Sequence, residues 1–320
     1  MSAGTDGGSA VQILINPIAG GGRSLGVWRR IAPLAAESLP GLRAMQTEGP
    51  GHATLLARDA VASGCRRLIV VGGDGTIQEV VAGILGTDTA VGVVPGGTGN
   101  DFSRTHRIPR DPEAALRLAL AGPIKRIDVG KVNGHVFVNV AGVGFDAEVA
   151  AWCKHRTRMV SGPAIYVAGI FRHLFTYSPQ ELTFTLDSRS FQERCLLLAV
   201  GNGRYYGGGM MMCPGAEADD GQFDVCVGGN LGKLETLRLL PLVFSGRHVG
   251  RPKVITYRAK HVTVASRVPM AIHADGEPVG MLPAEFQIVR NALSVAAPLE
   301  AAESQPGEAP ADRGRARAAG

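Results

Sequence analysis

The 320-residue chain lacks several features that would assign it to a common class of protein. Its five cysteines form no C-x-x-C pair and their number is odd, so neither a disulfide framework nor a zinc site is indicated. A reduced, cytoplasmic protein is therefore expected. Residues 1–10 carry neither the basic nor the apolar segment of a signal peptide. No apolar run approaches the ~20 residues that span a bilayer, so no transmembrane segment is expected.

Aromatic residues are also sparse, at 5% of the chain. The net charge of +5 and the pI of about 9.1 favour contact with anionic membranes or nucleic acid, although a generic basic protein has the same charge. Because no motif combines basic and aromatic residues, no nucleic-acid partner is expected.

The pattern of apolar residues divides the chain into two domains. Between residues 11 and 124, short apolar runs alternate with helical patterns, which predicts a parallel α/β domain. Between 125 and 298, short β-like runs dominate, one of them at 136–140, and helical insertions occur near 164–175 and 234–244. This texture predicts a mainly β, largely antiparallel domain. Residues 1–10 are expected to form a flexible N-terminus and residues 299–320 a disordered tail.

The strongest local signal is Gly72-Gly73-Asp74-Gly75-Thr76, which follows an apolar run and precedes a helical pattern. Glycines let backbone N–H groups approach an anion, and the N-terminus of a helix adds partial positive charge. Thr76 and Glu79 fit a capping box at the start of this helix. An isolated motif of this kind is equally well interpreted as a tight turn before a capped helix.

Two further glycine-rich loops follow predicted strands, at 16–22 (NPIAGGG) and 95–102 (PGGTGNDF). Ligands bind open α/β sheets at the carboxyl ends of the strands, so three such loops predict a ligand that carries phosphate. Neither G-x-x-x-x-G-K-[ST] nor G-x-G-x-x-G occurs there, which argues against a P-loop protein and a dinucleotide-binding fingerprint.

Together the three loops resemble the diacylglycerol kinase catalytic domain, a superfamily that includes sphingosine kinases, ceramide kinases and bacterial lipid kinases. The resemblance continues through segments 127–130 (IDVG), 142–146 (GVGFD), 219–221 (DDG) and 275–277 (DGE), and it covers about residues 11–298. Ala19 stands where many relatives have serine, and Gly97 is an additional glycine. The unmodified double glycine before Asp74 is more similar to the bacterial enzymes than to sphingosine kinases.

The resemblance implies an α/β nucleotide-binding domain, like that of NAD kinase and diacylglycerol kinase, followed by a β-sandwich-like domain. ATP and the substrate would lie between them, and the last strand is a candidate to return to the first domain. The residues expected to contact ATP are Asn16, Pro17, Ile18, Ala19, Gly20, Thr47, Gly72, Gly73, Asp74, Gly75, Thr76, Ile77, Gln78, Thr98 and Asn100.

The same resemblance assigns roles to acidic residues. Asp220, with the backbone carbonyls of Glu217 and Gln222, would bind Mg²⁺. Glu277, with Asp275 beside it, would accept the proton of a lipid hydroxyl. Asp74 would orient the nucleotide, the metal or that hydroxyl.

From the residues alone, these acids are weaker evidence for catalysis or metal binding, because each segment also fits a plain turn. Asp275-Gly276 is a hairpin-turn signal, and Asp219-Asp220-Gly221 is compatible with a plain turn. Beside three phosphate loops they fit phosphoryl transfer, which needs a metal to neutralise phosphate charge and a carboxylate to position or deprotonate the attacking hydroxyl. The residues leave open whether Asp275 or Glu277 accepts the proton.

Three functions are compared. The leading one is an ATP- and Mg²⁺-dependent lipid kinase that acts on diacylglycerol, with phosphatidylglycerol, sphingosine-like bases and ceramide open as substrates. An NAD kinase-like enzyme would share the loop at 72–76 but is not expected to carry the loop at 95–102 or the acids at 275–277. A non-catalytic nucleotide-binding regulator is disfavoured because Asp74, Asp220, Asp275 and Glu277 are all present.

A lipid substrate implies a peripheral protein that associates transiently with the membrane. Lys154, His155, Arg156 and Arg158 precede the apolar segment 165–175, which is either a membrane-contacting surface or a core helix with a solvated basic approach. Exposed β edges make a homodimer a candidate assembly.

Overall fold

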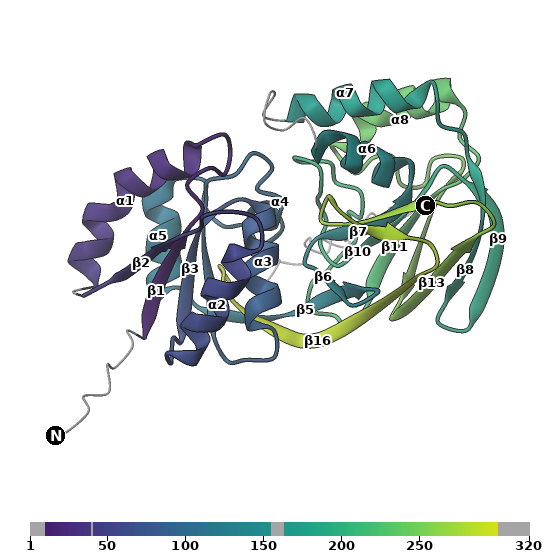
Figure 1. Ribbon diagram of the computed structural model, residues 1–320. Coiled ribbons are helices and arrows are strands. Elements are labelled where there is room, and N and C mark those ends of the chain that lie inside the picture. Colours follow the sequence, from purple (N-terminus) through teal and green to yellow (C-terminus); the bar gives the residue numbers. More distant parts are fainter. Residues whose placement is uncertain (1–9, 40, 155–162, 300–320) are drawn as a thin grey trace, which may run out of the picture.

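Two sheets organise the computed structural model, which describes residues 10–39, 41–154 and 163–299. Figure 1 shows an N-terminal α/β domain and a C-terminal domain in which helices cover one side of a β-sandwich. No helix among these residues is long and apolar enough to cross a membrane. All five cysteines lie in the described ranges, and each is buried.

The first domain is built on a parallel sheet in the order β2-β1-β3-β4. Helix α1 packs beside α5 and α2 beside α3, on opposite faces of the sheet (Figure 1). The apolar side chains of the central strands are therefore buried on both sides, which explains their continuous hydrophobic runs. The elements are β1 (Val11–Ile15), α1 (Arg23–Ser38), β2 (Arg43–Gln46), α2 (His52–Ala62), β3 (Arg67–Gly72), α3 (Asp74–Ile84), β4 (Ala90–Pro95), α4 (Asp101–Thr105) and α5 (Pro112–Ala121).

The second domain packs two antiparallel layers. One is the six-stranded sheet β12-β11-β10-β7-β14-β15, and the other contains β16, β13, β8 and β9, with β5 and β6 beside β16. Buried phenylalanines fill the space between the layers, and α6, α7 and α8 cover the six-stranded sheet. The elements are β5 (Ile124–Val132), β6 (His135–Phe137), β7 (Val140–Gly144), α6 (Phe145–Lys154), α7 (Pro163–Leu174), β8 (Gln180–Leu186), β9 (Arg189–Cys195), β10 (Leu197–Gly201), β11 (Phe223–Gly228), α8 (Lys233–Val243), β12 (Val254–Ala259), β13 (His261–Ser266), β14 (Ala271–Ala274), β15 (Glu277–Met281) and β16 (Ala284–Ala296).

Strand β16 belongs to both domains. Its first part pairs with β13, most of its length pairs with β5, and Ser294 and Val295 pair in parallel with β4. In Figure 1 it runs beneath the junction of the two domains. The backbone hydrogen bonds of one strand thus connect the nucleotide sheet to the sandwich.

Two local expectations from the sequence are wrong. The predicted strand at 136–140 is split into β6 and β7, because Asp275 takes the N–H groups of Val138, Asn139 and Val140. The predicted capping box does not form either, since α3 begins at Asp74 and Gly73 is its N-cap. The carboxylate of Glu79 instead accepts N–H groups at the start of α2.

Candidate active site

The three glycine-rich loops contact each other at the carboxyl ends of the parallel strands. A Cβ atom placed on Gly20 would lie 2.4 Å from the carbonyl oxygen of Gly96, and one on Gly97 would lie 2.4 Å from Cα of Gly73. Side chains at these positions would force the loops apart. The glycines therefore allow the backbones of the three loops to pack closely against each other, as a phosphate site at strand ends requires.

Side chains of the first loop and of the helix residue that follows it connect the three loops by hydrogen bonds. Arg23 donates from Nε to the carbonyl of Gly20 (3.0 Å), and from Nη2 to the carbonyl of Gly97 (3.0 Å) and the hydroxyl of Thr98 (3.1 Å). Asn16 donates from Nδ2 to the hydroxyl of Thr76 (2.9 Å). Arg23 was not among the predicted residues, although a cation directly after three glycines was a usable signal.

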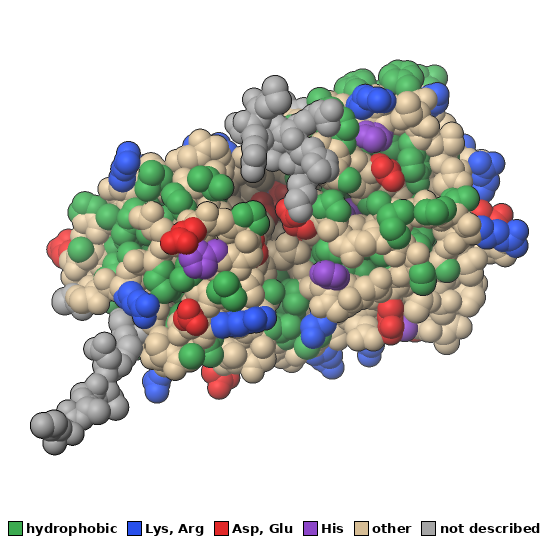
Figure 2. Space-filling model, in the orientation of Figure 1, with side chains coloured by type: hydrophobic (Ala, Val, Ile, Leu, Met, Phe, Trp, Pro, Cys, Tyr) green, Lys and Arg blue, Asp and Glu red, His purple; other side chains and the backbone are tan. Residues whose placement is uncertain are grey.

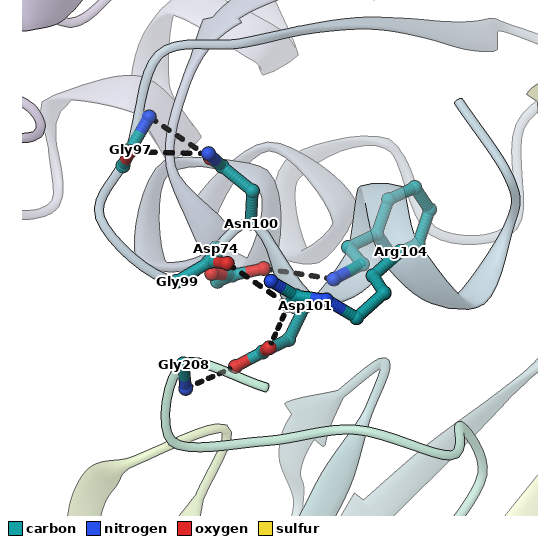
Figure 3. Close-up of polar contacts among 8 residues, drawn as sticks. Asp74, Gly97, Gly99, Asn100, Asp101, Arg104 and Gly208 are labelled. Atoms are coloured by element: carbon teal, nitrogen blue, oxygen red, sulfur yellow. Dashed lines mark hydrogen bonds and ion pairs between the residues drawn. The ribbon is translucent and has the colours of Figure 1, made fainter. Parts of the chain in front are cut away.

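Asn100 shapes the third loop by bonding to Gly97 in both directions, as acceptor at 2.9 Å and as donor at 3.1 Å (Figure 3). Its backbone is left-handed, with φ at 53°. This conformation places the N–H groups that follow it at the start of α4 toward Asp74. The Oδ1 atom of Asp74 accepts the N–H of Phe102 at 2.9 Å.

A second carboxylate, Asp101, lies beside Asp74 in Figure 3. It accepts from Arg104 (2.6 Å) and from the N–H of Gly208 (2.7 Å), which belongs to the other domain. Burial and then the charge of Asp74 raise the pKa of Asp101 to about 7, and burial raises the pKa of Asp74. Carboxylates with raised pKa values at a domain junction are typical of functional sites. No role for Asp101 was predicted, although it stood in a quoted motif.

The loop that supplies Gly208 was also missed. Gly207, Gly208 and Gly209 have φ values of 63°, 84° and 112°, which glycine adopts without a steric penalty. The guanidinium of Arg104 lies 5.5 Å from the ring of Tyr205, just before this loop. Three consecutive glycines between two strands were a visible signal in the sequence.

The predicted acidic turn connects β14 to β15. Asp275 and Gly276 have φ values of 50° and 85°, which is the conformation of a two-residue hairpin turn. Both carboxylate oxygens of Asp275 accept backbone N–H groups, at 2.7 to 3.0 Å. Burial, opposed by these bonds, raises its pKa to about 6. Asp275 is therefore an anchor of the turn, and its neighbour Glu277 is the better candidate for contact with a substrate hydroxyl.

Residues from both domains converge on this turn. Gln78 on α3 donates to the carbonyls of Val136 (2.8 Å) and Ala274 (3.3 Å). Burial, and then the charges of Cys153, Asp101, Asp74 and Glu277, raise the pKa of Tyr166 on α7. The carboxylates of Asp74, Asp101 and Glu277 thus lie close enough to act on one phenol. Figure 2 shows acidic side chains at the junction between the domains.

The predicted metal residues lie in the loop between β10 and β11. Asp220 forms an ion pair with Arg258 and accepts the N–H of Gln222 at 2.9 Å. Asp128 supports this loop by accepting the N–H of Gly221 at 2.7 Å. Among the residues that the structure describes, no three His, Cys, Asp or Glu side chains gather to hold a metal. The oxygen donors suit a hard cation, which would have to compete with Arg258 for Asp220.

An apolar cavity of about 80 Å³ lies between the six-stranded sheet and the helices α6, α7 and α8. Gly276 of the acidic turn and Tyr166 are part of its wall. The rest of the lining is mainly aliphatic and aromatic, and it includes Val149, Ile170, Leu196, Met210, Leu240 and Val243.

A two-domain phosphotransferase is the class of protein that this arrangement defines, and comparisons with known proteins agree. Residues 10–132 match the diacylglycerol kinase catalytic domain, and residues 139–297 match the YegS C-terminal NAD kinase beta sandwich-like domain. The chain is 34% identical over 257 residues to a diacylglycerol kinase of Staphylococcus aureus, strain bovine RF122 / ET3-1, which covers 80% of this chain and 82% of that protein. The same identity and coverage hold for the enzyme of strain JH9.

Solved structures show the same architecture. A crystal structure of a candidate diacylglycerol kinase from Bacillus anthracis str. Sterne has a TM-score of 0.75 and 26% identity, and the match covers 90% of this chain and 96% of that one. The chain therefore belongs to the diacylglycerol kinase family and is a lipid kinase. The predicted family, fold class and enzyme class are confirmed.

Proposed function

We propose that this protein transfers the γ-phosphoryl group of ATP, with Mg²⁺, to the free hydroxyl of diacylglycerol and so produces phosphatidic acid. One arrangement carries the proposal: beside three glycine-rich loops at the ends of parallel strands, Asp101 binds the N–H of Gly208 from the other domain, and the charges of Asp74, Asp101 and Glu277 all act on Tyr166.

The proposed roles follow from the chemistry of phosphoryl transfer. Backbone N–H groups of the loops at 16–22, 72–76 and 95–102 bind the phosphates. Thr47, directly after β2, and Gln78, on α3, lie beside these loops. A bound Mg²⁺ would neutralise the negative charge of the ATP phosphates. Glu277 accepts the hydroxyl proton, while Asp74 and Asp101 hold the geometry at the start of α3 and α4. Asp220, with the carbonyls of Glu217 and Gln222, remains the proposed protein site for a cation.

The substrate class is supported by the apolar cavity, because its wall reaches the acidic turn at Gly276. A lipid hydroxyl at Glu277 would have apolar surface beside it, whereas the dinucleotide substrate of an NAD kinase would meet few polar groups there. This observation favours a lipid over NAD.

The face beside this cavity supports contact with a membrane. Phe171 and Phe175 near the end of α7 are 46% and 62% exposed, and Leu234 on α8 is 59% exposed. Figure 2 shows hydrophobic side chains gathered at this end of the second domain. Lys233 stands over the ring of Phe175, which adds positive charge to the patch. Of the basic residues predicted to join this surface, His155, Arg156 and Arg158 lie outside the described residues.

The test is transfer of ³²P from γ-labelled ATP, with Mg²⁺, to a panel of detergent-dispersed lipids. The panel holds diacylglycerol, phosphatidylglycerol, sphingosine and ceramide, and NAD is included as a separate acceptor. Label on diacylglycerol supports the proposal. Label on another lipid instead would show that this lipid, and not diacylglycerol, is the substrate. Label on NAD alone would replace the function, and label on no acceptor would contradict it.

The first prediction concerns Glu277. Glu277→Gln keeps the size of the side chain but removes the proton acceptor, so kcat should fall by about 10²–10⁴-fold. ATP affinity should stay within about threefold, because the loops bind the phosphates independently of this carboxylate. Steady-state kinetics and calorimetric ATP titration measure the two quantities. A variant with near-native kcat would remove Glu277 from this role.

A further inference from the structure

A buried polar cluster lies next to the turn that carries Glu277, and the proposed chemistry assigns it no role. It consists of His273 on β14, Asp146 on α6 and Tyr206. The side chains of His273 and Asp146 are 0% and 1% exposed. Burial of an imidazole and a carboxylate is unfavourable unless each finds hydrogen-bond partners, so the partners show what the cluster holds in place.

His273 uses both ring nitrogens. Its Nε2 atom lies 3.1 Å from Oδ2 of Asp146, and its Nδ1 atom accepts the N–H of Gly276 at 3.3 Å. Because Nδ1 must offer a lone pair to Gly276, the proton of the ring lies on Nε2 and is donated to Asp146. This hydrogen-bond pattern assigns the neutral Nε2–H tautomer, and Asp146 is the group that selects it.

Tyr206 holds the ring of His273 from its face. The two rings stack with centroids 5.5 Å apart and an interplanar angle of 7°. Tyr206 directly precedes the glycine loop whose Gly208 N–H binds Asp101. His273 therefore contacts both the acidic turn and the segment that reaches the nucleotide domain.

We propose that His273, oriented by Asp146, is a positioning residue that holds Gly276 and thereby fixes the direction of the Glu277 carboxylate. Asp275 anchors its side of the turn through the three N–H groups of residues 138–140, and His273 anchors Gly276, the next residue. This inference rests on the proposed function of Glu277. A displacement of about 1 Å at a reacting group can cost about 10²-fold in rate, so the second anchor has a measurable effect.

Two substitutions separate the two hydrogen bonds of His273. In His273→Asn, the amide oxygen takes the place of Nδ1 and keeps an acceptor for Gly276, but the bond to Asp146 is lost. In His273→Gln, the longer amide reaches the place of Nε2 and keeps a partner for Asp146, but Gly276 loses its acceptor. Both variants lose the stacked ring, so each controls for the destabilisation of the other.

The expected result is a difference in kcat that the melting temperatures do not explain. His273→Gln should lower kcat for lipid phosphorylation by about 10–100-fold, with KM for ATP within about twofold. His273→Asn should retain kcat within about fivefold of the native value. Equal losses in both variants, or no loss in either, would overturn the positioning role.

A second measurement does not depend on activity. Two-dimensional ¹H–¹⁵N spectra of the protein labelled at its histidines report which ring nitrogen carries the proton. His273 should carry its ring proton on Nε2 and leave Nδ1 free to accept from Gly276. A proton on Nδ1 would overturn the inference. If the native protein labels no lipid, the proposed function fails, while these spectra still decide whether His273 holds Gly276.

Discussion

At the residue scale, the site is unusual in placing two acids, Asp74 and Asp101, next to each other in surroundings that disfavour their charge. The pKa of Asp101 is raised to about 7 because the side chain is buried and Asp74 lies beside it. Backbone N–H groups of Gly208 and Gly209 and the guanidinium of Arg104 oppose the shift. The pair is therefore held by donors from both domains, although burial disfavours its ionised form.

This shift predicts a pH dependence of stability. The unfolded chain releases the Asp101 proton near pH 4, whereas the folded protein keeps it to about pH 7, so the contribution of Asp101 to stability falls as the pH rises between these values. Asp101→Asn removes that fall. The melting temperature of the variant, relative to the native protein, should therefore be higher at pH 8 than at pH 5. Parallel curves of melting temperature against pH would contradict the assigned shift.

At the scale of elements, the loop between β10 and β11 connects the two domains through the N–H of Gly208. Gly208 has φ at 84°, and Gly134, in the turn between β5 and β6, has a nearly identical φ of 85°. Alanine at either position should cost about 1–2 kcal/mol of stability, because its Cβ is strained in the left-handed region.

Of the two substitutions, Gly208→Ala should affect catalysis and Gly134→Ala should not. Gly208→Ala relieves its strain by rotating the peptide away from Asp101, so kcat should fall by about tenfold or more, in line with the sensitivity of reacting groups to small displacements. Gly134→Ala is the matched control, since a Cβ there meets nothing within 4 Å. Chemical denaturation and steady-state kinetics measure both effects. Equal kcat values for the two variants would show that the loop does not support the site.

The sequence predicts some of these elements far better than others. Apolar runs followed by glycines locate β1, β3, β4 and the loops after them, because each signal is contained within about ten consecutive residues. The contacts that complete the site are not local. Asp275 binds Val138 across 137 positions, and Asp101 binds Gly208 across 107 positions. Such pairs depend on how the domains pack, which no local pattern contains.

The roles of individual residues were also predicted where the signal is local and missed where it depends on distant contacts. Asn16, Thr98 and Asn100 were predicted to contact ATP. In the structure the side chains of Asn16 and Thr98 bind residues of other segments, and that of Asn100 bonds within its own loop. Arg23 and Arg104 were missed because a single arginine in a sequence has many uses. Only the folded positions of the loop carbonyls show what these side chains hold.

At the scale of the whole molecule, β16 couples the domains, which predicts that they unfold together. Each domain contains one tryptophan: Trp28 packs against the core of the first, and Trp152 against the helices of the second. In Trp28→Phe and Trp152→Phe, fluorescence reports one domain at a time. The two denaturation midpoints should coincide.

A substitution in the shared strand sharpens this test. Val295 is fully buried in β16 and pairs with Val91 of β4, so Val295→Ala should cost about 1–3 kcal/mol. Both fluorescence probes should shift by the same amount. A shift seen by Trp28 alone, or two separate midpoints in the parent variants, would show that the domains are thermodynamically independent.

The position of β16 in the chain also bears on how the protein is made. A ribosome synthesises residues 11–95, which form the four parallel strands, long before residues 284–296, which border the outermost of them. Until that last strand emerges, the edge of β4 has no β16 beside it, and exposed strand edges invite pairing with other chains. The nucleotide-binding half of the nascent chain thus depends for its completion on a segment that is translated long after its own four strands.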